Sequence, residues 1–88
     1  MNWVVRVPED IERFIKSLSP KTIRQLRRSL NEMEHDPFRG NVKALQGMAW
    51  KGFYRKRTGD YRIIFVPHRA DRIVDIRDIA LKSEKTYR

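Results

Sequence analysis

The sequence contains no cysteine and no apolar run long enough to span a membrane. Without thiols the chain forms neither disulfides nor thiolate zinc sites, and a reducing compartment suits it. Its opening stretch, "MNWVVRVPED", reaches a proline and two acids too soon to hold the apolar region of a signal peptide. These absences argue against a disulfide-stabilised secreted domain and against a membrane protein. We expect a cytoplasmic protein.

Acidic residues are few in comparison with basic ones. The chain has 20 lysines and arginines against 11 aspartates and glutamates, which gives a formal net charge of +9. A length of 88 residues predicts one domain, residues 1–88. On so small a domain, this excess favours a polyanionic partner, either nucleic acid or an acidic protein, over charge that only maintains solubility.

The apolar patterns of the first half predict one strand and two helices. Residues 2–7, "NWVVRV", are rich in β-branched and aromatic residues, as in a strand, and end at Pro8. Two amphipathic helices follow, each with apolar residues at helical spacing. The first runs from Pro8 to Leu18. Ser19 caps the second, which continues to about Glu34.

The second half predicts three strands. The expected elements are a loop at 35–41, a partly extended connection at 42–52, strands at 53–57, 60–66 and 72–81, and turns at 58–59 and 67–71. The fold class is therefore α+β with the order β-α-α-β-β-β. An N-terminal helical hairpin would pack on one face of a small, twisted, largely antiparallel sheet. The other face is left for solvent or a partner.

The stretch "FYRKRTGDYRIIF", residues 53–65, crowds basic side chains around one turn. A two-residue loop at Thr58 and Gly59 would set Arg57 opposite Asp60, Arg55 opposite Arg62 and Phe53 opposite Ile64. Side chains alternate along a strand, so these six residues would share one face. The other face would carry Tyr54, Lys56, Tyr61, Ile63 and Phe65. We expect the aromatic face to be buried under the helices and the arginines to gather on the open face.

Two interpretations of this arginine cluster compete. Charges on a sheet can simply discourage pairing with other chains, but lysine serves that role well and these positions are arginine. Guanidinium groups bind phosphate through two parallel hydrogen bonds and stack on bases. The cluster therefore favours a phosphate site.

Residues 45–66, "LQGMAWKGFYRKRTGDYRIIFV", followed by 73–88, "IVDIRDIALKSEKTYR", resemble the RelE/ParE superfamily of toxins from prokaryotic toxin–antitoxin modules. The chain looks closer to the RelE branch, which cleaves mRNA in the ribosomal A site, than to ParE-like members, which poison DNA gyrase. The resemblance implies a ribosome-dependent, metal-independent endoribonuclease that acts by 2′-hydroxyl attack without a cofactor. The implied partners are the ribosome, mRNA and a cognate RelB-like antitoxin in a hetero-oligomer.

The resemblance also implies roles for individual residues. Arg62 matches the arginine that contacts the scissile phosphate, and Tyr87 matches a C-terminal tyrosine that stacks on substrate or transfers a proton. Ser83 stands where many relatives carry an arginine, so Lys82 or Lys85 would supply that charge. The implied catalytic residues are Arg55, Arg57, Arg62, Lys82 and Tyr87, with Lys51, Lys85 and Arg88 as further substrate-binding residues.

Two other functions stay open: a non-catalytic ParE-like gyrase inhibitor, and a basic RNA-binding module without toxicity. The basic strands together with Tyr87 favour the ribonuclease. Histidine, the usual acid–base catalyst, is scarce, and we expect His35 and His68 to be structural or surface residues. We expect Trp3 and Trp50 to pack in the core or in an interface.

Overall fold

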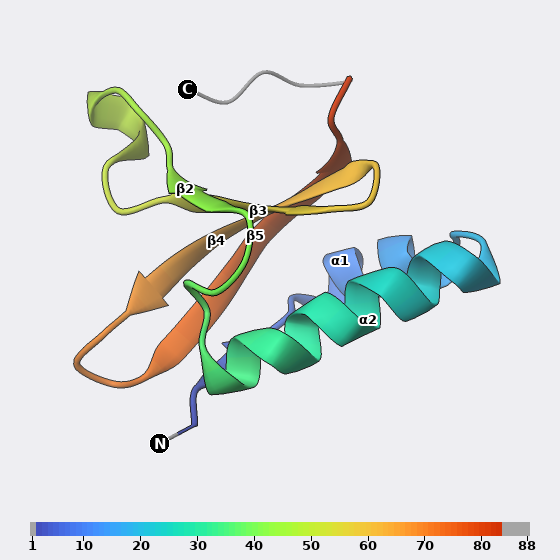
Figure 1. Cartoon of the computed structure of the whole chain (residues 1–88), viewed down its shortest axis with the longest axis horizontal. Helices are drawn as coiled ribbons and strands as arrows, with labels where there is room; N and C mark the ends of the chain where they lie inside the picture. The colour runs from blue at the N-terminus through green and yellow to red at the C-terminus, as the bar shows by residue number, and fades with distance from the viewer. Residues whose placement is uncertain (1, 84–88) are drawn as a thin grey trace.

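The computed structural model describes residues 2–83, and it has an α+β architecture (Figure 1). Five strands form one sheet in the order β1-β5-β4-β3-β2, in which only β1 and β5 are parallel. The fold class is confirmed, with one short strand added before the final three. The elements are β1 (Val4–Arg6), α1 (Glu9–Lys16), α2 (Pro20–His35), β2 (Val42–Ala44), the 3-10 helix η1 (Met48–Trp50), β3 (Tyr54–Thr58), β4 (Tyr61–His68) and β5 (Ile73–Leu81).

The two helices form the expected hairpin. Pro20 occupies the first turn of α2, and the Ser19 side chain accepts a hydrogen bond from the Thr22 backbone N–H, the usual N-cap arrangement. Arg27 of α2 donates two hydrogen bonds of 2.8 Å to the Glu12 carboxylate of α1, which lowers the pKa of that carboxyl. Neither helix has the length and apolar character of a membrane span, and this holds for all of residues 2–83.

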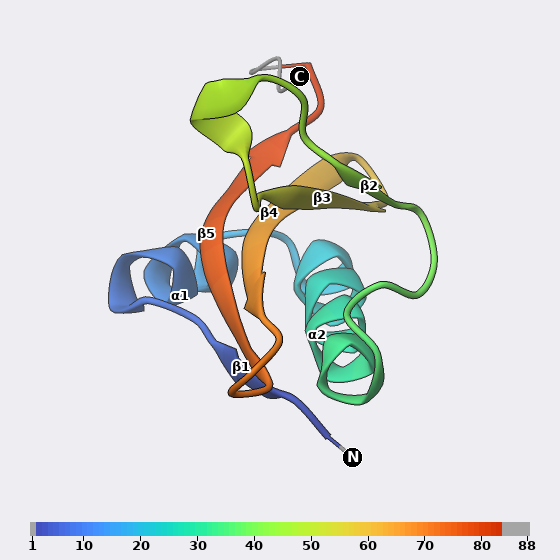
Figure 2. The same ribbon diagram turned by 90° about the vertical axis from the view of Figure 1, so that its left-hand side faces the viewer.

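The apolar core lies between the helical hairpin and one face of the sheet. Figure 2 shows α1 and α2 on either side of the long β4–β5 pair, both behind the same sheet face. Trp3 belongs to this core, as expected. The apolar stripe predicted for the second helix also enters it. The cluster consists of Trp3, Ile11, Ile15, Leu26, Leu30, Met33, Ile63, Phe65, Val74, Ile76 and Ile79.

The β3–β4 hairpin turns one residue later than predicted. Its loop is Gly59–Asp60, because Thr58 pairs with Tyr61. Gly59 has φ +56°, a conformation that favours glycine at the first position of a two-residue loop. The predicted cross-strand pairs were therefore wrong: Arg57 lies opposite Arg62 instead of Asp60.

The remaining pairs shift in the same way. Arg55 lies opposite Ile64 instead of Arg62, and Tyr54 takes a place in the ladder opposite Phe65. Phe53 precedes the strand. Because the register moved by two residues, the side chains within β3 and β4 kept their predicted faces, whereas Phe53 and Asp60 lie outside the two strands. Tyr54, Lys56, Tyr61, Ile63 and Phe65 do point toward the helices.

The prediction of a partly extended segment at 42–52 is confirmed, whereas the bounds of the turn at 67–71 were wrong. The segment 42–52 contains the strand β2 and the 3-10 helix η1. The turn predicted at 67–71 starts two residues later, since β4 runs to His68 and Pro67 pairs with Val74 of β5. The pairing of β3 with β4 ends at Phe65, so at Pro67 the β3 side of β4 has no partner strand. A proline, which lacks the backbone N–H, is tolerated at such a position.

Candidate phosphate-binding site

A hollow of about 280 Å³ opens on the sheet face that the helices leave uncovered. It lies over β2, β3 and β4. Its lining residues, all within 2–83, include four cationic side chains and no aspartate or glutamate. They are Lys43, Ala44, Leu45, Gln46, Arg55, Arg57 and Arg62, and we call this site the basic hollow.

The sheet register explains why the cations meet. Lys43 of β2 lies directly opposite Arg55 of β3, and Arg57 of β3 lies opposite Arg62 of β4. Directly opposed side chains of an antiparallel pair lie close together, and like charges in such pairs are destabilising. The hollow therefore holds two repulsive pairs side by side. A bound anion would relieve this repulsion.

Arg55 is fixed at the base of the hollow. The residue is only 8% exposed, and its Nη1 donates to the backbone oxygen and the Oδ1 of Asn41 at 3.3 and 3.2 Å. The same backbone oxygen accepts from the Arg57 N–H at 3.0 Å. Burial, followed by the charges of Arg57 and Arg62, lowers the pKa of Arg55. Because guanidinium stays protonated near neutral pH, Arg55 is a desolvated cation held in one orientation.

The predicted site residues divide into three groups. Arg55, Arg57 and Arg62 come together in the basic hollow. Lys82 is exposed, and its backbone N–H donates to the Asp60 oxygen at 2.9 Å, so the end of β5 lies beside the turn that follows Arg57. Lys51 is exposed in the loop after η1 and does not line the hollow. Lys85, Tyr87 and Arg88 lie outside the described residues.

Two residues of the site were missed in the sequence. Lys43 lies in a segment that showed no clear strand pattern, and only its pairing with β3 aims it at the hollow. Asn41 was interpreted as a loop residue, yet it positions the backbone and side chains of β3. The alternation of Val42, Lys43 and Ala44 was the one local signal of a strand.

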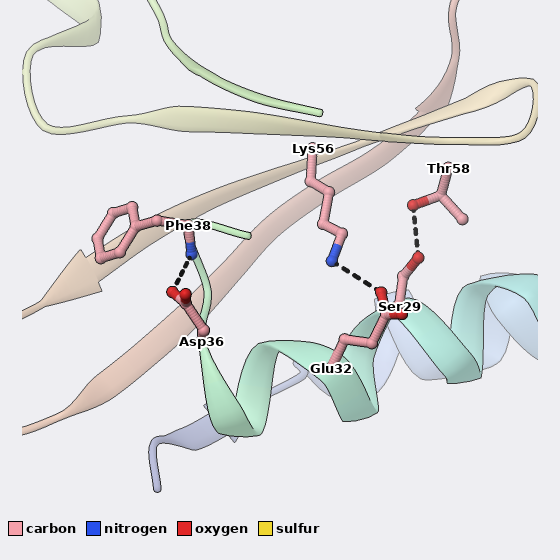
Figure 3. A network of polar contacts seen from close by, with 6 residues as sticks. All are labelled: Ser29, Glu32, Asp36, Phe38, Lys56 and Thr58. Atoms are coloured by element: carbon pink, nitrogen blue, oxygen red, sulfur yellow. Dashed lines mark hydrogen bonds and ion pairs between the residues drawn. The ribbon is translucent and has the colours of Figure 1, made fainter. Parts of the chain in front are cut away.

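A polar network ties β3 to α2 on the opposite face (Figure 3). Lys56, only 4% exposed, places its ammonium group 3.1 Å from the Glu32 carboxylate. Two residues further along β3, the hydroxyls of Thr58 and Ser29 share a hydrogen bond of 2.7 Å. These contacts hold β3, which carries two arginines of the hollow, against the helical layer.

Neither histidine lines the basic hollow. His35 ends α2 and is exposed, and the exposed His68 contacts Asp75 through Nε2 at 2.7 Å. Both therefore lie on the surface, as expected. Over residues 2–83, no three histidine, aspartate or glutamate side chains are placed to share a metal ion.

The fold and this geometry can now be compared with known proteins. A family model described as the ParE toxin of type II toxin–antitoxin systems, parDE, matches residues 2–85. The chain belongs to this toxin family. The predicted membership of the RelE/ParE superfamily is confirmed. No curated protein sequence matches the chain.

Solved structures share the toxin's fold. A chain of the archaeal RelE–RelB complex from Pyrococcus horikoshii OT3 is 23% identical, with a TM-score of 0.81 over 97% of this toxin and 100% of that chain. A chain of the toxin–antitoxin complex RelBE2 from Mycobacterium tuberculosis is 19% identical, with a TM-score of 0.79 over 93% and 100%. A mutant of E. coli toxin RelE in the free state is 16% identical, with a TM-score of 0.68 over 94% and 86%.

Proposed function

We propose that this toxin stops translation by cutting mRNA in the ribosomal A site. The observation that carries the proposal is the basic hollow, where Lys43, Arg55, Arg57 and Arg62 surround a space of about 280 Å³. Arginine binds phosphate oxygens through paired hydrogen bonds. Four cations around one hollow suit a phosphate whose negative charge grows during the reaction.

In the proposed reaction, the 2′-oxygen of a ribose attacks the neighbouring phosphorus while the bond from phosphorus to the 5′-oxygen breaks. The products are a 2′,3′-cyclic phosphate and a 5′-hydroxyl. The cations of the hollow would stabilise the dianionic transition state, usually the largest contribution to such catalysis. Lys82 and Tyr87 are the proposed proton-transfer groups: one would accept the proton of the 2′-hydroxyl and the other would protonate the departing 5′-oxygen. Lys51, Lys85 and Arg88 would bind flanking phosphates.

The proposal is tested by incubating the toxin with programmed ribosomes and mapping the 5′ ends of the mRNA. We expect cuts within the A-site codon and far slower cutting of the same RNA without ribosomes. The reason is that the ribosome would supply the substrate geometry that the hollow alone does not impose. Equal cutting of free RNA would contradict ribosome dependence.

The contacts of Asn41 give a second prediction. Asn41→Ala removes one acceptor of the Arg55 side chain but keeps the backbone oxygen that accepts from Arg57. We expect kcat for ribosome-bound mRNA to fall about tenfold with little change in KM, since a looser Arg55 would stabilise the transition state less well. Asn41→Asp, which keeps an acceptor, should retain more activity than Asn41→Ala if hydrogen bonding matters most. A change in KM alone would contradict this role.

A second candidate function is inhibition of DNA gyrase, and the family description as ParE toxin favours it. The two candidates predict different results in a supercoiling assay with purified gyrase. A ribonuclease leaves supercoiling unchanged. Inhibition of supercoiling without cutting of mRNA would support the gyrase function.

We further propose that an antitoxin of the RelB kind neutralises this toxin, as the solved complexes are named for RelE with RelB. The basic hollow is the expected target of acidic antitoxin residues, and the complex would be a hetero-oligomer in the cytoplasm. Part of the attraction would be electrostatic, so association should slow as salt is raised. Amide exchange in the complex should fall across 53–66. Blocked cleavage without added protection there would contradict this arrangement.

A further inference from the structure

Beside the basic hollow lies a pair of aromatic rings that the core does not use. Within the described part of the chain, the apolar core includes neither Trp50 nor Phe53. Their ring centroids are 5.4 Å apart at an interplanar angle of 86°, an edge-to-face contact. Both rings are half-buried. We call Trp50 and Phe53 the aromatic pair.

The aromatic pair shares the open face of the sheet with the hollow. Phe53 directly precedes β3, two residues before Arg55. The Leu45 N–H donates to the Phe53 oxygen at 2.9 Å, and Leu45 itself lines the hollow. The guanidinium of Arg77 in β5 lies 5.6 Å from the Phe53 ring centre. The Phe53 ring therefore lies next to one cation, and its backbone is bonded to a residue of the hollow.

Backbone hydrogen bonds help to hold the loop that carries these rings. Backbone hydrogen bonds from Trp50 to Gly47, from Lys51 to Met48 and from Phe53 to Trp50 already close the segment around η1. A rigid loop with aromatic rings beside a row of cations is the combination by which proteins hold single-stranded nucleic acid.

We propose that the aromatic pair binds an unpaired base next to the phosphate held in the basic hollow. The inference rests on the proposed RNA function and adds a substrate class: single-stranded RNA, with one base stacked on Trp50 or Phe53 and its phosphate on the arginines. A paired base is already stacked in its helix, so duplex RNA would gain the phosphate contacts alone. Exposed Arg77 would add a cation beside the stacked base.

The test measures binding to the purified full-length toxin without ribosomes. The probes are a short single-stranded RNA, the same RNA with one abasic nucleotide, the corresponding duplex, and inorganic phosphate. We expect Trp50→Leu to weaken binding of the single strand about five- to a hundredfold, the effect typical of one stacked base, and to leave phosphate binding unchanged. Trp50→Phe should keep most of the affinity. The abasic strand should bind the native toxin more weakly than the intact strand does. Trp50→Leu should bind the abasic strand as well as the native toxin does.

Matched controls separate this result from a folding defect. Met48→Ala changes a side chain of the same loop that is 95% exposed, and it should bind RNA as the native toxin does. Thermal unfolding of each variant shows whether it is folded, and Phe53→Leu provides a second probe of stacking. Equal single-strand binding by Trp50→Leu and the native toxin would overturn the inference, as would equal affinity for the abasic strand. Loss of antitoxin binding with unchanged RNA binding would assign the surface to a protein partner and also overturn it.

The inference and the proposed function fail separately. Base-dependent RNA binding without mRNA cutting on ribosomes would reject the proposed ribonuclease and support the aromatic pair as an RNA contact. Cutting of mRNA with no response to the abasic nucleotide or to Trp50→Leu would support the ribonuclease and reject the aromatic pair.

Discussion

Arg62→Ala is expected to lower cleavage of ribosome-bound mRNA by about a hundred- to a thousandfold while the protein stays folded. Loss of one well-placed donor to a charged transition state typically has an effect of this size. Stability should change little, because the substitution also removes the like-charge pair between Arg62 and Arg57 in the β3–β4 ladder. Initial cleavage rates on programmed ribosomes, together with melting temperatures, measure both effects.

Two further variants sharpen this prediction. Arg62→Lys keeps the charge but loses the planar fork, so its activity should fall between those of the native toxin and the alanine variant. Arg13→Ala is the matched control, since Arg13 is an exposed arginine of α1 with one surface ion pair to Glu9. It should cut normally. Unfolding of Arg62→Ala would mean that Arg62 has a structural role. Normal cutting by this variant would mean that Arg62 has no role in catalysis.

Glu32→Ala is expected to lower the free energy of unfolding by about 1–3 kcal/mol. It would leave the Lys56 ammonium group buried between β3 and α2 without its carboxylate partner, and an uncompensated buried charge is costly. The loss should be smaller than for a fully buried pair, because the Glu32 side chain is 53% exposed. For a domain of this size each kcal/mol shifts the melting temperature by about 4–8 °C.

The Lys56 side supplies the decisive comparison. Lys56→Met keeps the apolar stem and removes the charge, so it should be nearly neutral, and the double variant Glu32→Ala/Lys56→Met should regain most of the lost stability. Glu34→Ala, another exposed glutamate of α2, is the control and should have little effect. Equal losses for Glu32→Ala and Glu34→Ala would mean that the effect comes from the helix and not from the ion pair.

The faces of the β3–β4 hairpin could be predicted from sequence, but its pairs could not. Side-chain alternation has a period of two, so a register error of two residues left Arg55, Arg57 and Arg62 on the correct side. The turn has a local cause in Gly59, whose positive φ suits the first position of the loop, and a tertiary contact accompanies it. Thr58 stays in the strand, where its hydroxyl bonds to Ser29 of α2. No local pattern around "RTGD" reveals that contact.

The three arginines that line the basic hollow could be predicted from the sequence, but Lys43 and Asn41 could not. The arginines could be identified from their residue type and spacing. Lys43 and Asn41 reach the site only through the pairing of a three-residue edge strand and through the loop before it. A three-residue strand is too short to show a clear alternation of apolar and polar residues, so it is hard to predict from its own sequence. The strand with which it pairs lies elsewhere in the chain. The buried Arg55 is a related case, since its exposure depends on what covers β3.

The parallel pairing of β1 with β5 has a consequence for how the toxin folds. Val4 pairs with Ile73, and every pair of this ladder is 69 residues apart in sequence. Closing such a long loop costs conformational entropy before the contacts between its ends can form. Contacts between residues far apart in sequence therefore slow folding. β1 is therefore expected to be among the last strands to be paired. Until β1 is in place, the edge of β5 that receives it stays unpaired, and an unpaired strand edge can pair with another chain.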